Sequence, residues 1–224
     1  MTSGVMVDVG AHRGTTSSPF LEAGWQVYAF EPDNRNRAEL EAWLGTSPNL
    51  VVSGLAVSDE SSADVPFFRS EISAGISGLI GFHESHEESG TVSVTTLAEF
   101  FERHGITSVD FLKVDTEGND LRVLRGLDLS RCQPQVIIAE FDEAKAQNGG
   151  HRLSDLVTFL DSNGYGYAIS EWHPVTEYGS EHSWRGLTSS LAELASDRAW
   201  GNVIATRDKE LLGSIVAKLS SAKS

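Results

Sequence analysis

The residues most able to do chemistry begin with a glycine-rich turn near the N-terminus. Gly10 and Gly14 follow the apolar segment Val5–Val9, and Glu31 ends the next apolar segment about 20 residues further on. Glycines let the chain turn tightly and let a ligand come close, and a carboxylate at this spacing can bind both hydroxyls of a ribose. The pattern therefore predicts a site for a cofactor that contains a nucleoside.

Two side chains in this region favour S-adenosylmethionine over a dinucleotide. A pyrophosphate needs a glycine at the middle position of the turn, where this chain has His12. S-adenosylmethionine has no pyrophosphate, and Asp8 would offset the charge of its sulfonium and amine. None of the four tyrosines has a lysine four places on, as short-chain dehydrogenases require. The residues that we expect to bind the cofactor are Asp8, Gly10, His12, Gly14, Glu31, Pro32, Ala56 and Asp115.

A second group of charged residues lies in the middle of the chain. Lys113 and Asp115 are two residues apart at the end of an expected strand, so their side chains point to the same face. Glu140 ends the next expected strand and is the predicted partner of Lys113. These charges would either form a structural ion pair or surround an acceptor hydroxyl whose proton a base must take. Glu117 would either join them or cap a helix.

Histidines offer further candidates for the base. His83 and His86 lie in a stretch rich in Ser, Gly and Glu, which a hydrophilic loop explains better than a metal site, so no metal is expected. His173 and His182 lie among aromatic residues that suit either a sugar face or core packing. The residues that we expect to act in catalysis are Asp115, Lys113, Glu117, Glu140 and His83.

Strands and helices alternate along almost the whole chain. The expected strands are Val5–Val9, Gln26–Phe30, Leu50–Val52, Ala63–Arg69, Thr91–Thr95, Val109–Val114, Gln135–Ala139, Tyr165–Ser170 and Asn202–Thr206. The expected helices are Thr15–Ala23, Asn34–Leu44, Leu97–His104, Leu121–Leu124, Leu153–Ser162 and Lys209–Leu219. This order predicts an α/β fold with about seven mostly parallel strands, helices on both faces, and ligands beyond the carboxyl ends of the strands. Ser70–Gly90 and Glu171–Trp200 are expected to be loops that select the acceptor, with Ser73–Gly78 a mobile segment over the cofactor.

Three blocks of sequence resemble the FkbM-type methyltransferases over nearly the whole chain. The blocks are Val7–Gly14 with Phe30-Glu31-Pro32, then Asp110–Gly118 with Val123–Gly126, and more weakly Ile138-Ala139-Glu140 with Gly164-Tyr165 and Asn202–Ala205. The second, with its Lys-x-Asp-x-Glu-Gly core, is the most specific. The resemblance implies a Rossmann-like class I methyltransferase fold, S-adenosylmethionine as cofactor, and methylation of a hydroxyl on a natural product or sugar. Two departures concern how the site is closed: almost nothing precedes Gly4, and Thr96-Leu97-Ala98 lacks the carboxylate of the family's usual Thr-Leu-Asp.

Composition narrows the expected function. A formal net charge of −15 would repel nucleic acids and acidic membranes, and the single cysteine, Cys132, excludes an internal disulfide. We expect one cytoplasmic O-methyltransferase domain over residues 1–224 that acts on a small-molecule or sugar hydroxyl, with no nucleic acid or membrane partner. Two alternatives remain open: a non-catalytic or accessory module of a larger biosynthetic system, and an NAD(P)-dependent oxidoreductase.

Overall fold

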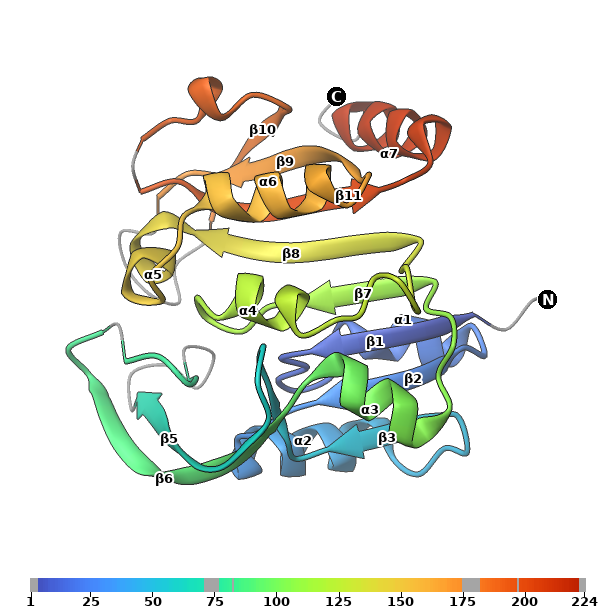
Figure 1. Cartoon of the computed structure of the whole chain (residues 1–224), viewed down its shortest axis with the longest axis vertical. Helices are drawn as coiled ribbons and strands as arrows, with labels where there is room; N and C mark the ends of the chain where they lie inside the picture. Colours follow the sequence, from blue (N-terminus) through green and yellow to red (C-terminus); the bar gives the residue numbers. More distant parts are fainter. Residues whose placement is uncertain (1–3, 71–76, 82, 175–181, 197, 222–224) are drawn as a thin grey trace.

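The main sheet has eight strands in the order β10-β9-β11-β8-β7-β1-β2-β3 (Figure 1). The computed structural model describes residues 4–70, 77–81, 83–174, 182–196 and 198–221. The strands are β1 (Val5–Val9), β2 (Gln26–Phe30), β3 (Leu50–Ser53), β7 (Phe111–Val114), β8 (Val136–Asp142), β9 (Gly166–Trp172), β10 (Trp184–Thr188) and β11 (Trp200–Thr206). The five strands from β3 to β8 are parallel, whereas β11 is antiparallel to both β8 and β9. This confirms the expected Rossmann-like α/β fold with a mostly parallel sheet.

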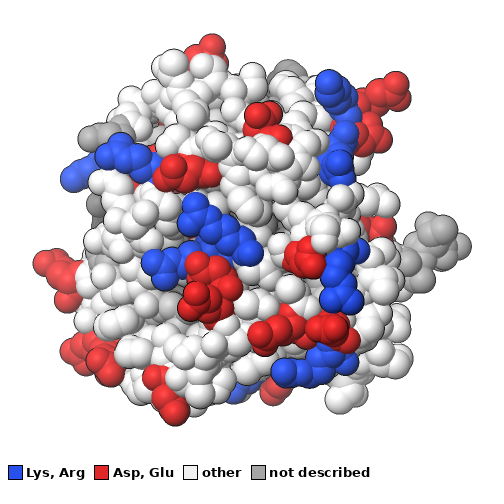
Figure 2. Space-filling model, in the orientation of Figure 1, with Lys and Arg blue, Asp and Glu red and all other residues white. Residues whose placement is uncertain are grey.

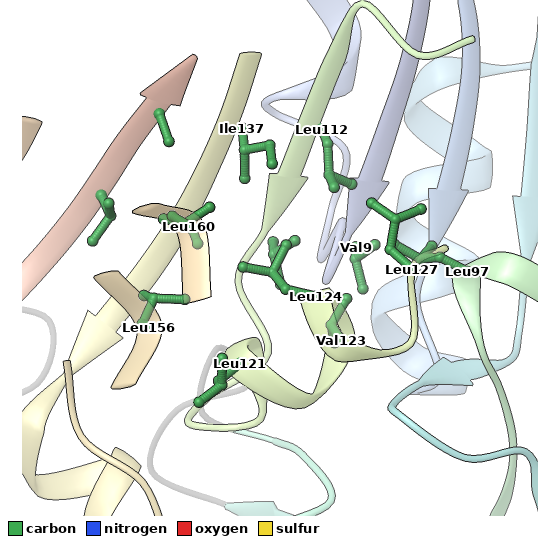
Figure 3. Close-up of a cluster of buried hydrophobic side chains, with 14 of the residues drawn as sticks. Val9, Leu97, Leu112, Leu121, Val123, Leu124, Leu127, Ile137, Leu156 and Leu160 are labelled. Atoms are coloured by element: carbon green, nitrogen blue, oxygen red, sulfur yellow. The ribbon is translucent and has the colours of Figure 1, made fainter. Parts of the chain in front are cut away.

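Helices cover both faces of this sheet because neighbouring strand residues point to opposite sides. The helices are α1 (Ser17–Glu22), α2 (Asn34–Leu44), α3 (Leu97–His104), α4 (Asp120–Arg125), α5 (Glu143–Asn148), α6 (Leu153–Ser162) and α7 (Lys209–Ser221), with a short 3-10 turn at Leu191–Glu193. The apolar residues of α3, α4 and α6 pack with Val9, Leu112 and Ile137 in the larger core (Figure 3). On the other face, α1 and α2 cover a smaller core around Met6 and Val27.

The caps of α3 show how the sequence sets an element's bounds. Thr96 precedes the helix and its hydroxyl accepts a hydrogen bond from the Glu99 backbone N–H at 3.1 Å. Gly105 ends it in the left-handed region, with φ +65°, which favours glycine. Phe100 and Phe101 lie between these caps and are buried.

A second sheet of three strands stands beside the main one, in the order β4-β6-β5. Its strands are β4 (Ala56–Val57), β5 (Ser62–Ser70) and β6 (His86–Thr95), and β5 and β6 form a curved antiparallel arm (Figure 1). Both strands expected here are present, and β6 starts five residues earlier than predicted, at His86. Residues 73–76 of the expected mobile segment lie outside the described residues.

Several elements were absent from the sequence prediction, among them β4, β10 and α5. Strand β10 lies within 171–200, which was expected to be a loop, and it pairs with the edge strand β9. Its five residues have a glycine at the centre and give no alternating pattern; the strand is fixed by contacts made across to β9, such as the Trp184 indole N–H donating to the Ser170 hydroxyl at 2.9 Å. Helix α5 follows β8 directly and has only six residues, too few for a periodic pattern.

Candidate active site

A cavity of about 250 Å³ lies at the carboxyl ends of β1, β2 and β7, where ligands bind in sheets of this kind. The arm formed by β5 and β6 closes one side through Phe67, and the short strand β4 adds Ala56 and Val57. Polar groups enter from the turns that follow the three strands. The wall includes Gly10, Ala11, His12, Glu31, Pro32, Ser77, Gly78, Lys113, Asp115, Thr116, Glu117 and Asn119.

The turn after β1 forms the floor of this cavity. Gly10 has φ +77°, and a Cβ at this position would overlap the carbonyl oxygen of Asp115. The backbone N–H groups of Gly10 and Ala11 both donate to the Phe30 carbonyl, at 3.0 and 2.9 Å, which ties the turn to β2. His12 also has a positive φ of +50°, and its Nε2 is buried without a hydrogen-bond partner among the described residues. Gly14 lies outside the cavity wall, against the side chain of Leu44.

Glu31 presents a buried carboxylate to the cavity. Its side-chain oxygens accept one hydrogen bond each, from the His12 and Asp33 backbone N–H groups, both at 2.8 Å. Each oxygen keeps a lone pair for another donor, such as a ribose hydroxyl. Burial of the residue, which is 6% exposed, raises the pKa of Glu31 to about 7, although the two N–H groups act in the opposite direction.

Lys113 is held by three oxygens, one from β1, one from the turn that follows β1 and one from the end of its own strand, β7. Its ammonium donates to the Gly10 carbonyl at 2.6 Å and pairs with Asp115 at 3.3 Å and with Asp8 at 3.4 Å. The predicted partner, Glu140, is not among them, because Asp8 and Asp115 lie closer on the same side of the sheet. Burial acts to lower the pKa of Lys113, but the charges of Asp115 and Asp8 outweigh it and raise the pKa.

Asp8 has a different position from the one expected of a cofactor ligand. It is fully buried, accepts a hydrogen bond from the Ser17 hydroxyl at 2.7 Å, and lies outside the cavity wall. Its carboxylate pairs with Lys113, which does line the cavity. Asp8 therefore balances Lys113 rather than facing a ligand directly.

A second buried lysine forms ion pairs with the remaining carboxylates. Lys145, on α5, pairs with Glu117 at 2.6 Å, Glu140 at 3.6 Å and Asp142 at 3.8 Å. Carboxylate oxygens of Asp115, Glu117 and Glu140 lie within 4.8 Å of one another. Lys145 was not among the residues predicted from the sequence. Glu140 was expected at the active site; it lies outside the cavity wall, with its carboxylate near those of Asp115 and Glu117.

The three clustered carboxyl groups differ in pKa. Burial raises the pKa of Glu117 to about 7 against the opposing charge of Lys145, and burial together with the charge of Asp115 raises that of Glu140 well above its usual value. Burial also acts on Asp115, but the ammonium groups of Lys113 and Lys145 outweigh it and lower the pKa. Near neutral pH, Asp115 is thus ionised, whereas Glu117 is close to its midpoint.

The loop that carries Glu117 is fixed by its neighbours. Glu117 adopts φ +59°, a costly conformation for a residue with a side chain. The Asp120 carboxylate accepts from the backbone N–H groups of Thr116 and Gly118, at 2.9 and 3.2 Å, and the Asn119 amide donates to the Val57 carbonyl at 2.9 Å. Asp120, not Glu117, is therefore the carboxylate that binds the backbone at the start of α4.

The histidine candidates lie outside this cavity wall. His83 places Nδ1 2.6 Å from the Ser85 hydroxyl, and His86 belongs to β6. His173 and His182 contact Trp200, which pairs with the last residue of β8. The Trp200 indole N–H donates to the His173 carbonyl at 2.7 Å, and the His182 ring centroid lies 5.1 Å from that of Trp200. Tyr178, from the same aromatic segment, lies outside the described residues.

Charges on the outer surface are mixed on the face that Figure 2 shows. Acidic side chains are spread over this face and basic ones lie beside them, so no broad basic patch is visible there. None of the described helices is long and apolar enough to cross a membrane. The expectation that nucleic acid is not a substrate stays a prediction.

Comparison with known sequences identifies one family. The sequence model described as "Methyltransferase FkbM domain" matches residues 8–167. The hexuronic acid methyltransferase AglP of Haloferax volcanii is 29% identical over 137 residues, which are 61% of this chain and 55% of that protein. The 2-O-methyltransferase NoeI of Sinorhizobium fredii is 24% identical over 174 residues, 70% of this chain and 71% of that protein. The chain thus spans little more than half the length of the first of these relatives.

Comparison with solved structures gives matches at low identity. The magnesium protoporphyrin IX methyltransferase ChlM of Synechocystis PCC 6803, solved with bound S-adenosylmethionine, aligns with a TM-score of 0.46 and 12% identity, over 92% of this chain and 71% of that one. The precorrin-6y C5,15-methyltransferase of Geobacter metallireducens GS-15 gives a TM-score of 0.46 and 12% identity, over 92% of this chain and 82% of that one.

Proposed function

Because the chain belongs to the FkbM methyltransferase family, we propose that it transfers the methyl group of S-adenosylmethionine to a hydroxyl oxygen of a sugar or another small molecule. The observation that carries this proposal is that Glu31 and Glu117 enter one cavity from two different strand ends. In this proposal, Glu31 holds the ribose of the cofactor and Glu117 accepts a proton. Two relatives support a sugar hydroxyl as acceptor by their names, a hexuronic acid methyltransferase and a 2-O-methyltransferase.

The cavity suits S-adenosylmethionine on three counts. The Glu31 oxygens have lone pairs that face the cavity and can accept the ribose hydroxyls. Gly10 lines the cavity, and the absence of a side chain lets this turn pack closely against the Asp115 carbonyl. The buried Nε2 of His12 has no partner among the described residues, which is the state expected of a group that a ligand completes. Pro32 and Ala56 would pack against the same ligand.

Glu117 is the residue best placed to take the proton of the acceptor hydroxyl. When bound, S-adenosylmethionine supplies an electrophilic methyl group that forms a bond to the acceptor oxygen as its bond to sulfur breaks. A base works best with a pKa near the working pH, and burial raises that of Glu117 to about 7. Lys145, 2.6 Å from the carboxylate, stabilises its ionised form before it accepts the proton. Asp115 and Lys113 stay ionised beside it and orient the acceptor.

A transfer assay tests the proposal. The protein is incubated with S-adenosylmethionine labelled in the methyl group and with hydroxylated glycosides and aglycones, and labelled product is measured after separation. We expect label on oxygen of at least one acceptor. Saturable S-adenosylmethionine binding without transfer to any acceptor would favour a binding module, and binding of a nicotinamide cofactor in its place would favour an oxidoreductase.

The variant Glu117→Gln separates catalysis from binding. It keeps the shape of the side chain but removes the base, so we expect kcat to fall about 10²- to 10⁴-fold while the Kd for S-adenosylmethionine changes little. The matched control is Glu41→Gln, on the exposed face of α2, which should leave both quantities unchanged. An unchanged kcat in Glu117→Gln would contradict the assignment of the base.

A further inference from the structure

The charged groups that line the cavity leave no cation for an acidic acceptor. Among the described residues in its wall, the carboxylates are Glu31, Asp115 and Glu117, and the one ammonium is that of Lys113. Lys113 is already held by Asp8, by Asp115 and by the Gly10 carbonyl. Its charge is balanced within the protein.

Cations near the cavity wall are paired as well. Arg13, next to the wall residue His12, pairs with the exposed Glu39 at 2.6 Å. Lys145 lies among Glu117, Glu140 and Asp142. On the arm, Arg69 of β5 pairs with Asp33 at 2.6 Å and donates to the Asn34 side chain at 2.8 Å. A ligand anion could pair with Lys145 or Arg69 only by taking that group from carboxylates that are themselves largely buried, which is costly.

Two segments that the structure does not describe carry no basic residue. The sequences of 71–76 and 175–181 contain no lysine or arginine, and their ionisable acids are Glu71, Glu177 and Glu181. Wherever these segments lie, they add negative charge rather than positive. Among the described residues, the cavity wall therefore carries more carboxylates than ammonium groups.

From this balance we infer that the acceptor is a neutral polyol or sugar, or one that carries an amine, and that carboxylated and phosphorylated acceptors are refused. The inference rests on the proposed function, because it concerns the acceptor of that reaction. A carboxylate or phosphate beside Asp115 and Glu117 would meet like charge in a partly buried site, which disfavours its binding. An ammonium would instead gain from both. In this respect the chain would differ from the relative whose name specifies a hexuronic acid.

Matched acceptors test the inference. The protein is given methyl-labelled S-adenosylmethionine and four acceptors built on one sugar ring: the neutral glycoside, its amino analogue, its uronic acid and its 6-phosphate, with several ring stereoisomers of each. Ion exchange then separates the labelled products by charge. We expect label in the neutral or amino fractions, at a rate at least about tenfold above the matched acids. An acid methylated as fast as its neutral counterpart would overturn the inference while leaving the proposed function standing. Label in no fraction would contradict the proposed function itself.

A charge introduced into the wall provides an independent test. Ser77 lines the cavity next to Gly78, which packs against Glu117 and Thr116. The variant Ser77→Lys should raise the ratio of acidic to neutral product about tenfold, because it supplies the missing cation. Ser77→Met, of similar length and without charge, is the control and should not raise it. Equal ratios in the two variants would show that charge does not select the acceptor, and would overturn the inference.

Discussion

The variant Glu31→Gln should gain stability relative to the wild type as the pH rises, when both proteins are free of ligand. Glu31 is buried, and its pKa of about 7 lies above the ordinary value of 4.5. The folded protein therefore holds a proton that the unfolded chain has lost, so the stability of the wild type falls as the pH rises between these two values. A glutamine has no charge to bury, and this loss disappears in the variant.

The size of the effect follows from the same two values. The difference between 4.5 and about 7 corresponds to a burial cost of about 3 kcal/mol when the carboxyl group is ionised in both states, above pH 8. At pH 5 this burial cost is less than about 1 kcal/mol, because the Glu31 carboxyl group is still protonated in the folded protein. The amide also leaves one of two backbone N–H groups, that of His12 or of Asp33, without an acceptor. That loss costs about 1–3 kcal/mol but does not depend on pH.

The assay is chemical denaturation of the wild type and the variant at pH 5 and at pH 8, with Glu41→Gln as the exposed control. The free energy of unfolding of Glu31→Gln minus that of the wild type should rise by about 2–3 kcal/mol between the two pH values. The control should show no such rise, since Glu41 is exposed. An equal difference at pH 5 and pH 8 would refute the reasoning, because the carboxylate would then carry no burial cost for a ligand to offset.

Three further outcomes are expected. Lys113→Met should lower the free energy of unfolding by about 3–5 kcal/mol in denaturant titrations, because it leaves Asp8 buried without a countercharge, and adding Asp8→Asn should restore part of it. Gly10→Ala should abolish S-adenosylmethionine binding and lower Tm, since its Cβ overlaps a carbonyl oxygen. The control is Gly24→Ala, at a similar φ with open space around it, which should lower the free energy of unfolding by only about 1 kcal/mol. The rate of methyl transfer should rise with pH through about 7 as Glu117 loses its proton, and the pH profile of Glu117→Gln should be flat.

Much of the fold was predictable because its signals are local. The apolar segments around Val7 and Val27 and the cap at Thr96 identify their strands and helix without help from the rest of the chain. The position of Glu31 in the cavity was also predictable, since the carboxyl ends of neighbouring parallel strands meet at one edge. By contrast, β10 depends on contacts across to β9, which the sequence pattern does not reveal.

The charge pairing within the site was harder to predict because it depends on register and side-chain reach. Lys113 could contact an acid on either neighbouring strand, and the register opposite β1 places it beside Asp8 rather than Glu140. Lys145 lies on a helix too short to give a recognisable pattern. It pairs with Glu117 and Glu140, which are not among the partners of Lys113. The spacing of Glu140 and Lys145, five residues apart across the end of a strand, was the one available signal.

Calorimetric titration of the protein with S-adenosylmethionine, alongside NAD and NADP, tests the central claim most directly. The structure predicts saturable binding of S-adenosylmethionine at one site, weakened at least about tenfold in Glu31→Gln by the loss of a charged hydrogen-bond acceptor, and no binding of either nicotinamide cofactor. Binding of NAD or NADP in place of S-adenosylmethionine, or S-adenosylmethionine binding that is unchanged in Glu31→Gln, would contradict it.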